Sequence, residues 1–231
     1  ERPVSERRDR SAGRPWLAAY ALMLGALAAV VGLRVVTGSP IGTFTRDVFS
    51  TAEIPVWTGI LSNLGVFLWI SALAVSAFTV AVTPPSAAWR NVLIAAAAVS
   101  GTLAVDDFFM IHEWILPEYL GVDERVPLLL YALAAGGLVL AVRGRDPDGR
   151  VDRVLWAAIG LLGLSVALDL VEPADAPEWR YLVEEGFKFL GIGTWLGFVA
   201  TMASQAVGVN DSGGTGAGAP VDPASASTPA P

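Results

Sequence analysis

Ionisable residues stand beside long uncharged runs at three places in the sequence. The first group follows residues 91–105, the second follows residues 154–168, and the third comes directly before residues 189–210. A charged group inside a membrane costs roughly 2.5–3.5 kcal/mol on insertion scales, so it usually faces the protein interior and has a function. The candidate site residues are therefore Asp106, Asp107, His112, Glu113, Asp169, Glu184, Glu185 and Lys188.

These residue types predict a cation site. One imidazole with several carboxylates suits Zn, Mn or Fe, and carboxylates alone suit Ca. On a continuous helix, Asp106 and Glu113 are seven residues apart and would share a face, while Glu184 and Lys188 have the spacing of an ion pair. We expect Lys188 to be a counter-charge or a proton-coupled partner. The residues predicted to bind a divalent metal ion are Asp106, Asp107, His112, Glu113, Asp169, Glu184 and Glu185.

The composition places these residues in a membrane protein. Hydrophobic residues make up 54% of the 231 residues and charged residues only 16%, with a mean hydropathy of +0.56. These values exclude a disordered chain, and a net charge of −7 argues against nucleic-acid partners. The absence of cysteine excludes a disulfide framework and a cysteine nucleophile. The expected partners are the lipid bilayer and other membrane subunits, either further copies of the chain or a larger complex.

The uncharged windows predict six transmembrane helices, because a helix needs about 20 apolar residues to cross the hydrocarbon core. The fold class expected is therefore an all-α integral membrane protein, a bundle of six transmembrane helices. The predicted spans are residues 16–37, 55–82, 90–113, 126–143, 154–171 and 181–207.

The arginines predict the orientation of these helices. With six spans, ten arginines fall on the side of the two termini and four on the opposite side. Cytoplasmic loops carry the excess of positive charge, so both termini are expected in the cytoplasm and the protein in the cytoplasmic membrane. Fourteen of the 22 acidic residues then lie at the outer ends of helices or in outer loops. The candidate site is therefore expected to open outward.

Three segments follow from this topology. Residues 1–15 form a basic cytoplasmic segment, and residues 16–208 form the transmembrane domain. Residues 209–231 contain no aromatic residue, leucine or isoleucine, so they cannot bury a core, and a disordered Gly/Ala/Pro/Ser-rich cytoplasmic tail is expected.

Three functions fit the candidate site. The first is a divalent-cation site, as in a metal-dependent hydrolase that acts on an outer-leaflet lipid with a metal-bound water as nucleophile. The second is a cation- or proton-coupled transporter or channel. The third is an accessory subunit of a membrane complex in which the acids form only structural ion pairs. The sequence leaves open whether the protein is an enzyme.

Overall fold

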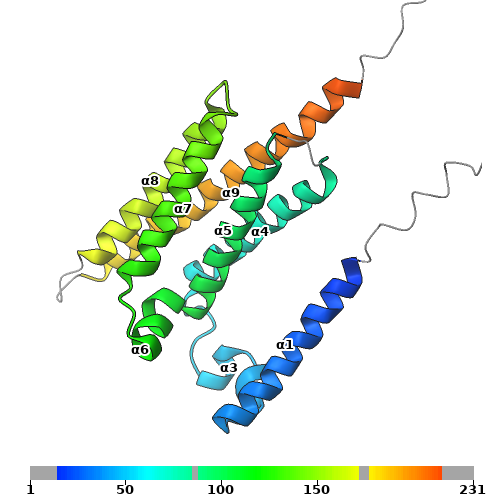
Figure 1. Cartoon of the computed structure of the whole chain (residues 1–231). Coiled ribbons are helices and arrows are strands. Elements are labelled where there is room, and N and C mark those ends of the chain that lie inside the picture. The colour runs from blue at the N-terminus through cyan, green and yellow to red at the C-terminus, as the bar shows by residue number, and fades with distance from the viewer. Residues whose placement is uncertain (1–14, 85–87, 172–176, 215–231) are drawn as a thin grey trace, which may run out of the picture. The chain divides into compact units, whose positions relative to one another are not determined.

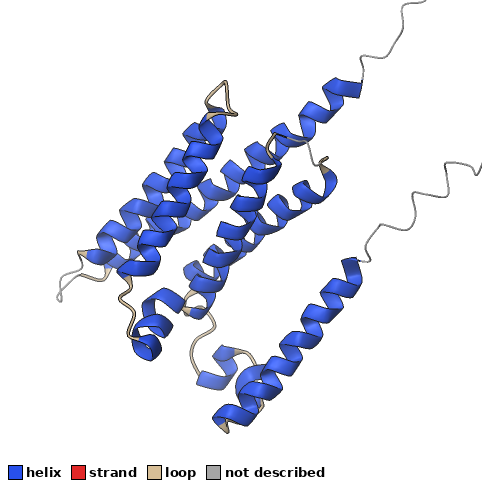
Figure 2. Cartoon of the chain, in the orientation of Figure 1, coloured by secondary structure: helices blue, strands red, loops and turns tan. Residues whose placement is uncertain are grey.

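The structure, a computed structural model, describes residues 15–84, 88–171 and 177–214, and these contain helices, turns and loops but no strand (Figure 2). The chain divides into two compact units, residues 1–58 and residues 59–231. The first unit contains α1 (Pro15–Thr37), α2 (Gly42–Thr45) and α3 (Val48–Ala52). The second contains α4 (Ile60–Val82), α5 (Arg90–Phe109), a π-helical turn η2 (Ile111–Ile115), α6 (Leu116–Leu120), α7 (Arg125–Arg143), α8 (Arg150–Leu170) and α9 (Trp179–Gly214).

Six helices within the described ranges are long and apolar enough to cross a membrane, namely α1, α4, α5, α7, α8 and α9. This confirms the all-helical class and the number of candidate spans. The second span begins at Ile60 and not at residue 55, because Pro55 opens a turn in which Thr58 N donates to Pro55 O over 3.0 Å. Gly59 then enters α4 in the left-handed conformation (φ 65°) that glycine adopts without strain.

The ends of the predicted segments are placed in part. Helix α9 continues to Gly214, beyond the boundary expected at residue 208. Residues 1–14 of the predicted basic segment and residues 215–231 of the predicted tail lie outside the described residues.

Five helices of the second unit form a ring of contacts. α4 contacts α5, α5 contacts α7, α7 contacts α8, α8 contacts α9, and α9 returns to α4 (Figure 1). These five helices are called the bundle below. Helix α9 also contacts α5, so it lies next to three members of the ring.

The apolar core fills the end of the bundle at which α7 and α8 are joined. It contains the C-terminal halves of α4, α7 and α9 and the N-terminal halves of α5 and α8, with fully buried residues such as Leu93, Val142, Leu155 and Phe198. Gly191 brings α8 and α9 together, because a Cβ atom there would lie 2.8 Å from Leu162 Cγ. The absence of a side chain at this position therefore permits close packing of the two helices.

The third predicted span is wrong at its end. The sequence predicts a continuous helix over residues 90–113, but α5 ends at Phe109 and Met110 takes the left-handed conformation (φ 52°, ψ 47°). This conformation costs a non-glycine residue about 1–3 kcal/mol, so other contacts must stabilise it. The next residues form the π-helical turn η2, and they do not continue the face of α5.

Candidate functional site

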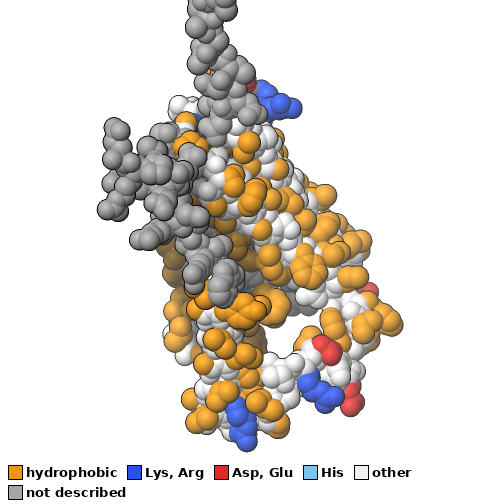
Figure 3. All heavy atoms as spheres, turned by 90° about the vertical axis from the view of Figure 1, so that its right-hand side faces the viewer, with side chains coloured by type: hydrophobic (Ala, Val, Ile, Leu, Met, Phe, Trp, Pro, Cys, Tyr) orange, Lys and Arg blue, Asp and Glu red, His pale blue; other side chains and the backbone are white. Residues whose placement is uncertain are grey.

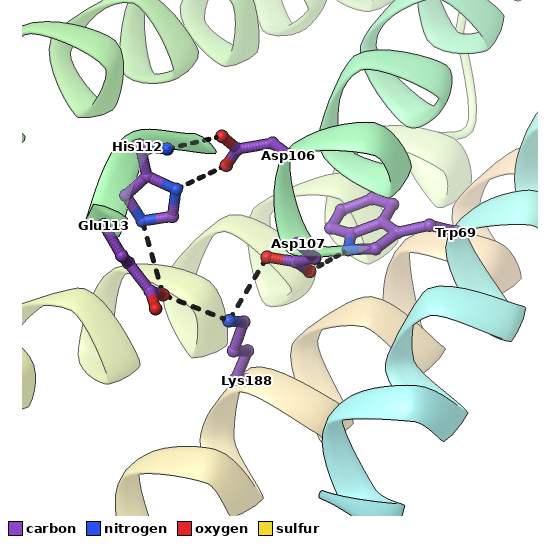
Figure 4. Close-up of polar contacts among 6 residues, drawn as sticks. All are labelled: Trp69, Asp106, Asp107, His112, Glu113 and Lys188. Carbon is purple, nitrogen blue, oxygen red and sulfur yellow. Dashed lines mark hydrogen bonds and ion pairs between the residues drawn. The ribbon is translucent and has the colours of Figure 1, made fainter. Parts of the chain in front are cut away.

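The reversal at Met110 brings His112 back onto the end of α5. The backbone N–H of His112 donates to Asp106 Oδ1 over 3.0 Å, and the ring Nδ1 donates to Asp106 Oδ2 over 2.5 Å (Figure 4). Asp106 is only 2% exposed, and each oxygen of this buried carboxylate accepts a hydrogen bond from His112. These two bonds stabilise the turn, and they fix which ring nitrogen carries the proton.

Asp107 connects α5 to α4 and α9. Its Oδ2 accepts a hydrogen bond from the indole Nε1 of Trp69 on α4 over 2.9 Å. Its Oδ1 lies 3.2 Å from Lys188 Nζ on α9. Adjacent aspartates therefore have separate partners, and the sole lysine of the chain compensates the charge of the second one.

Glu113 lies between the two basic side chains of the site. Its Oε1 is 3.6 Å from His112 Nε2 and 3.9 Å from Lys188 Nζ. The side chain is 44% exposed, the largest exposed fraction among these ion-pair partners. Both distances exceed that of a direct hydrogen bond, so Glu113 interacts with its partners more weakly than Asp106 and Asp107 do with theirs. The charged cluster, as it is called below, comprises Asp106, Asp107, His112, Glu113 and Lys188 (Figure 4).

The charged cluster lines one end of a cavity of about 290 Å³ within the bundle. The remaining ionisable residues of the lining are Asp169 on α8 and Glu184 and Glu185 on α9. All eight candidate residues of the sequence thus surround a single cavity. The rest of its wall is mostly apolar and comes from all five helices of the bundle, with Trp69, Val99, Leu103, Leu128, Ala132, Ala135, Ile159, Leu162, Val166, Ile192 and Trp195.

The carboxylates around His112 change its affinity for a proton. Burial lowers the pKa of the imidazole, but the hydrogen bond and the negative charge of Asp106, together with the charge of Glu113, outweigh burial and the repulsion of Lys188. The pKa of His112 is therefore raised above its ordinary value of 6.5. His112 lies beyond the end of α5, at the rim of the site.

The structure brings the candidate site residues together in a different way from the one that the sequence predicted. The prediction that Asp106 and Glu113 share a helical face is wrong, because the chain reverses between them at Met110. Lys188 lies at ion-pair distance from Asp107 and Glu113, and the Glu184–Lys188 pair stays a prediction. Among the described residues, no group of three or more His, Cys, Asp or Glu side chains has an arrangement that could hold a metal ion. The divalent metal ion and its ligands also stay predictions.

Sequence reasoning missed the aromatic residues of the site. Trp69 and Trp195 are each 2% exposed, and their rings meet edge to face with centroids 5.7 Å apart. Trp195 Nε1 donates to Ser100 Oγ over 2.9 Å. A tryptophan in the middle of an apolar span was an available signal, because its buried N–H needs a hydrogen-bond acceptor. Tyr131, whose ring meets that of His112 edge to face, carried no comparable signal.

Fold and site together define the class of this protein. In its described residues it is an all-helical protein, with six helices that could cross a membrane and a partly buried cluster of ionisable residues beside a cavity. The chain belongs to the family described as "Domain of unknown function (DUF8692)", which matches residues 16–202 and so includes every candidate site residue. Neither a curated protein nor a solved structure matches the chain.

Proposed function

We propose that the chain is a multi-pass protein of the cytoplasmic membrane with both termini in the cytoplasm. The six apolar helices and the excess of arginine on the side of the termini support this topology. Hydrophobic side chains also cover much of the described surface in Figure 3. In the second unit, Phe78 is 69% exposed and Leu140 is 73% exposed. A surface of this kind suits lipid and not water.

We further propose that the cavity is an outward-facing site that binds a cation in competition with protons. The observation that carries this proposal is the charge of the lining. Six carboxylates face the cavity together with one lysine and one histidine, so acidic side chains outnumber basic ones in the lining. A partly buried and partly apolar site strengthens electrostatic attraction, so a cation is the ligand that this lining favours.

Glu113 is the residue through which protons and the cation would compete. An entering cation would bind to this exposed carboxylate, whose ion pairs with His112 and Lys188 are long. Protonation of His112 places a positive charge at the same carboxylate. The groups that act on His112 are Asp106, Glu113 and Lys188, and the ring of Tyr131 packs against it from α7. Cation binding should therefore weaken as His112 is protonated at lower pH.

The contacts of two carboxylates favour competition between a cation and protons over a metal-dependent hydrolase. Both oxygens of Asp106 accept hydrogen bonds from His112. Those of Asp107 are engaged by Trp69 and Lys188. A metal ion would have to displace these partners before it reached the carboxylates. A transporter remains the natural context for a proton-coupled cation site in a membrane.

The test is calorimetric titration of the purified protein in detergent with methylammonium, Ca²⁺, Mn²⁺ and Zn²⁺ at pH 6 and pH 8. At least one cation should bind more weakly at pH 6. Glu113→Gln should lower its affinity at least tenfold, whereas Glu118→Gln, which removes an exposed carboxylate outside the cavity, should leave it unchanged. Equal affinities in the two variants, or no binding of any cation, would overturn the proposal and favour an accessory subunit with structural ion pairs.

Elemental analysis of the same samples distinguishes the proposed cation site from a metal-dependent hydrolase. Stoichiometric Zn, Mn or Fe in the purified protein that is lost in the Asp106→Asn/Asp107→Asn double variant would support a metal-dependent enzyme. Thermal unfolding of each variant confirms that it is folded before its binding is compared.

A further inference from the structure

The cavity is longer than a bare cation requires. On α9 it extends from Glu184 to Trp195, and on α8 from Asp169 back to Ile159. At 1.5 Å per residue these stretches are roughly 15–17 Å long. On both helices the carboxylates lie at one end and the apolar residues at the other. The cavity therefore has a charged end and an apolar end, separated along the axis of the bundle.

The volume of the cavity sets the size of its occupant. A water molecule takes up about 30 Å³ in the liquid, so 290 Å³ corresponds to about ten groups of that size. A single inorganic cation would occupy only the charged end and leave the apolar end empty.

Ser165 provides a polar group between the two ends of the cavity. This serine lines the cavity from α8 and is only 5% exposed. Its hydroxyl makes no hydrogen bond with any residue that the structure describes. The hydroxyl faces the open space of the cavity, so it can form a hydrogen bond with a polar atom of a bound molecule. Ser165 lies one helical turn from Asp169, between the charged end and the apolar end.

We infer that the cavity binds a small amphiphilic amine, with its ammonium group at Glu113 and its apolar part against Trp69, Trp195 and Ile159. This inference rests on the proposed cation site and names the class of its ligand. The excess of carboxylates selects a cationic head over an anionic one. The apolar end selects an apolar body, and the volume given above corresponds to about ten non-hydrogen atoms for head and body together.

The probe is n-octylammonium, which combines a cationic head with an apolar chain of suitable size. Three controls each remove one feature: octanoate has the opposite charge, 1-octanol has no charge, and methylammonium has no chain. Titrations are carried out in lipid nanodiscs, and the heat of partitioning into empty nanodiscs is subtracted. Octylammonium should bind at least tenfold more tightly than each of the three controls.

Two glycines of α8 provide a matched pair of variants. Gly163 lines the cavity and Gly160 does not, and a Cβ atom at either position would meet no atom within 4 Å. Gly163→Leu should fill part of the apolar end and weaken octylammonium binding at least tenfold, while methylammonium binding stays unchanged. Gly160→Leu should affect neither ligand.

The outcomes separate this inference from the proposed function. If methylammonium binds through Glu113 as tightly as octylammonium does, the ligand class is wrong and the cation site stands. If octylammonium and octanol bind equally and Glu113→Gln has no effect on either, the cavity is an apolar pocket and both proposals fail. If Gly163→Leu and Gly160→Leu behave alike, the ligand does not occupy the cavity and the inference is overturned.

Discussion

The two halves of the bundle satisfy their polar groups in different ways. In the packed half, which holds the apolar core, several buried hydroxyls bond within their own helix: Thr79 Oγ1 donates to Val75 O over 2.8 Å, and Ser100 Oγ donates to Ala96 O over 2.7 Å. In the half that contains the cavity, ionisable side chains bond between elements, as Trp69 and Lys188 do with Asp107.

This difference separates residues that maintain the fold from residues that respond to a ligand. A hydroxyl bonded to its own helix is satisfied wherever that helix goes, so such hydroxyls place little constraint on how the helices pack. The charged cluster needs α4, α5, η2 and α9 in fixed positions, and a change in any one charge leaves another without a partner. We therefore place sensitivity to pH and to cations in the cavity half.

The largest expected effect concerns the packed half alone. Phe198 is fully buried, and its ring lies 5.3 Å from that of Trp195. Phe198→Ala should lower the free energy of unfolding by about 3–5 kcal/mol, because it leaves a cavity in the core. Phe78→Ala, at a position 69% exposed, is the matched control and should cost much less. Thermal unfolding in detergent makes the comparison, and similar losses in both would show that the packed half is not the stabilising core.

A smaller loss is expected from the charged cluster. Lys188→Met should destabilise the protein by about 3 kcal/mol, since Asp107 and Glu113 lose their lysine partner. The Lys188→Met/Asp107→Asn double variant should recover part of this loss, because the buried charge is removed together with its counter-charge. No loss in the single variant would show that Lys188 is solvated and that the cavity half is not held together by charge.

The contact between Gly191 and Leu162 tests the comparison of the two halves of the bundle, because it lies where they meet. Gly191→Ala should cost about 1–3 kcal/mol, since the added methyl group would clash with Leu162 and with the backbone of α8. Gly160→Ala is the control, because a Cβ atom there has no neighbour within 4 Å. Equal stability of the two variants by thermal unfolding would mean that α8 and α9 separate at no cost.

The smallest effect is a dependence of stability on pH that arises in the cavity half. Because the pKa of His112 is raised in the folded state, its proton stabilises the fold at pH values below 6.5. This contribution is lost as the pH rises through the folded-state pKa, so the melting temperature should fall between pH 6 and pH 8. His112→Gln should remove this slope, and an unchanged slope in that variant would assign it to other groups.

The sequence predicts the helices well because length and the absence of charge are local properties. Fifteen or more uncharged residues in a row restrict a segment to a membrane or a protein core, and all six such segments form helices. The helix ends are less accurate. Nothing in the sequence around Met110 indicates that the chain changes direction there. The left-handed conformation of this residue depends on bonds between His112 and Asp106 that form only in the folded chain.

The sequence by itself determined which residues are costly to bury, and so it identified the eight ionisable residues of the cavity. Only the tertiary structure decided their partners. Asp107 bonds Trp69, 38 residues away, and pairs with Lys188 on the last helix. The physical reason is that the cost of burying a charge belongs to the residue, whereas the contact that offsets this cost depends on which helices the fold brings together.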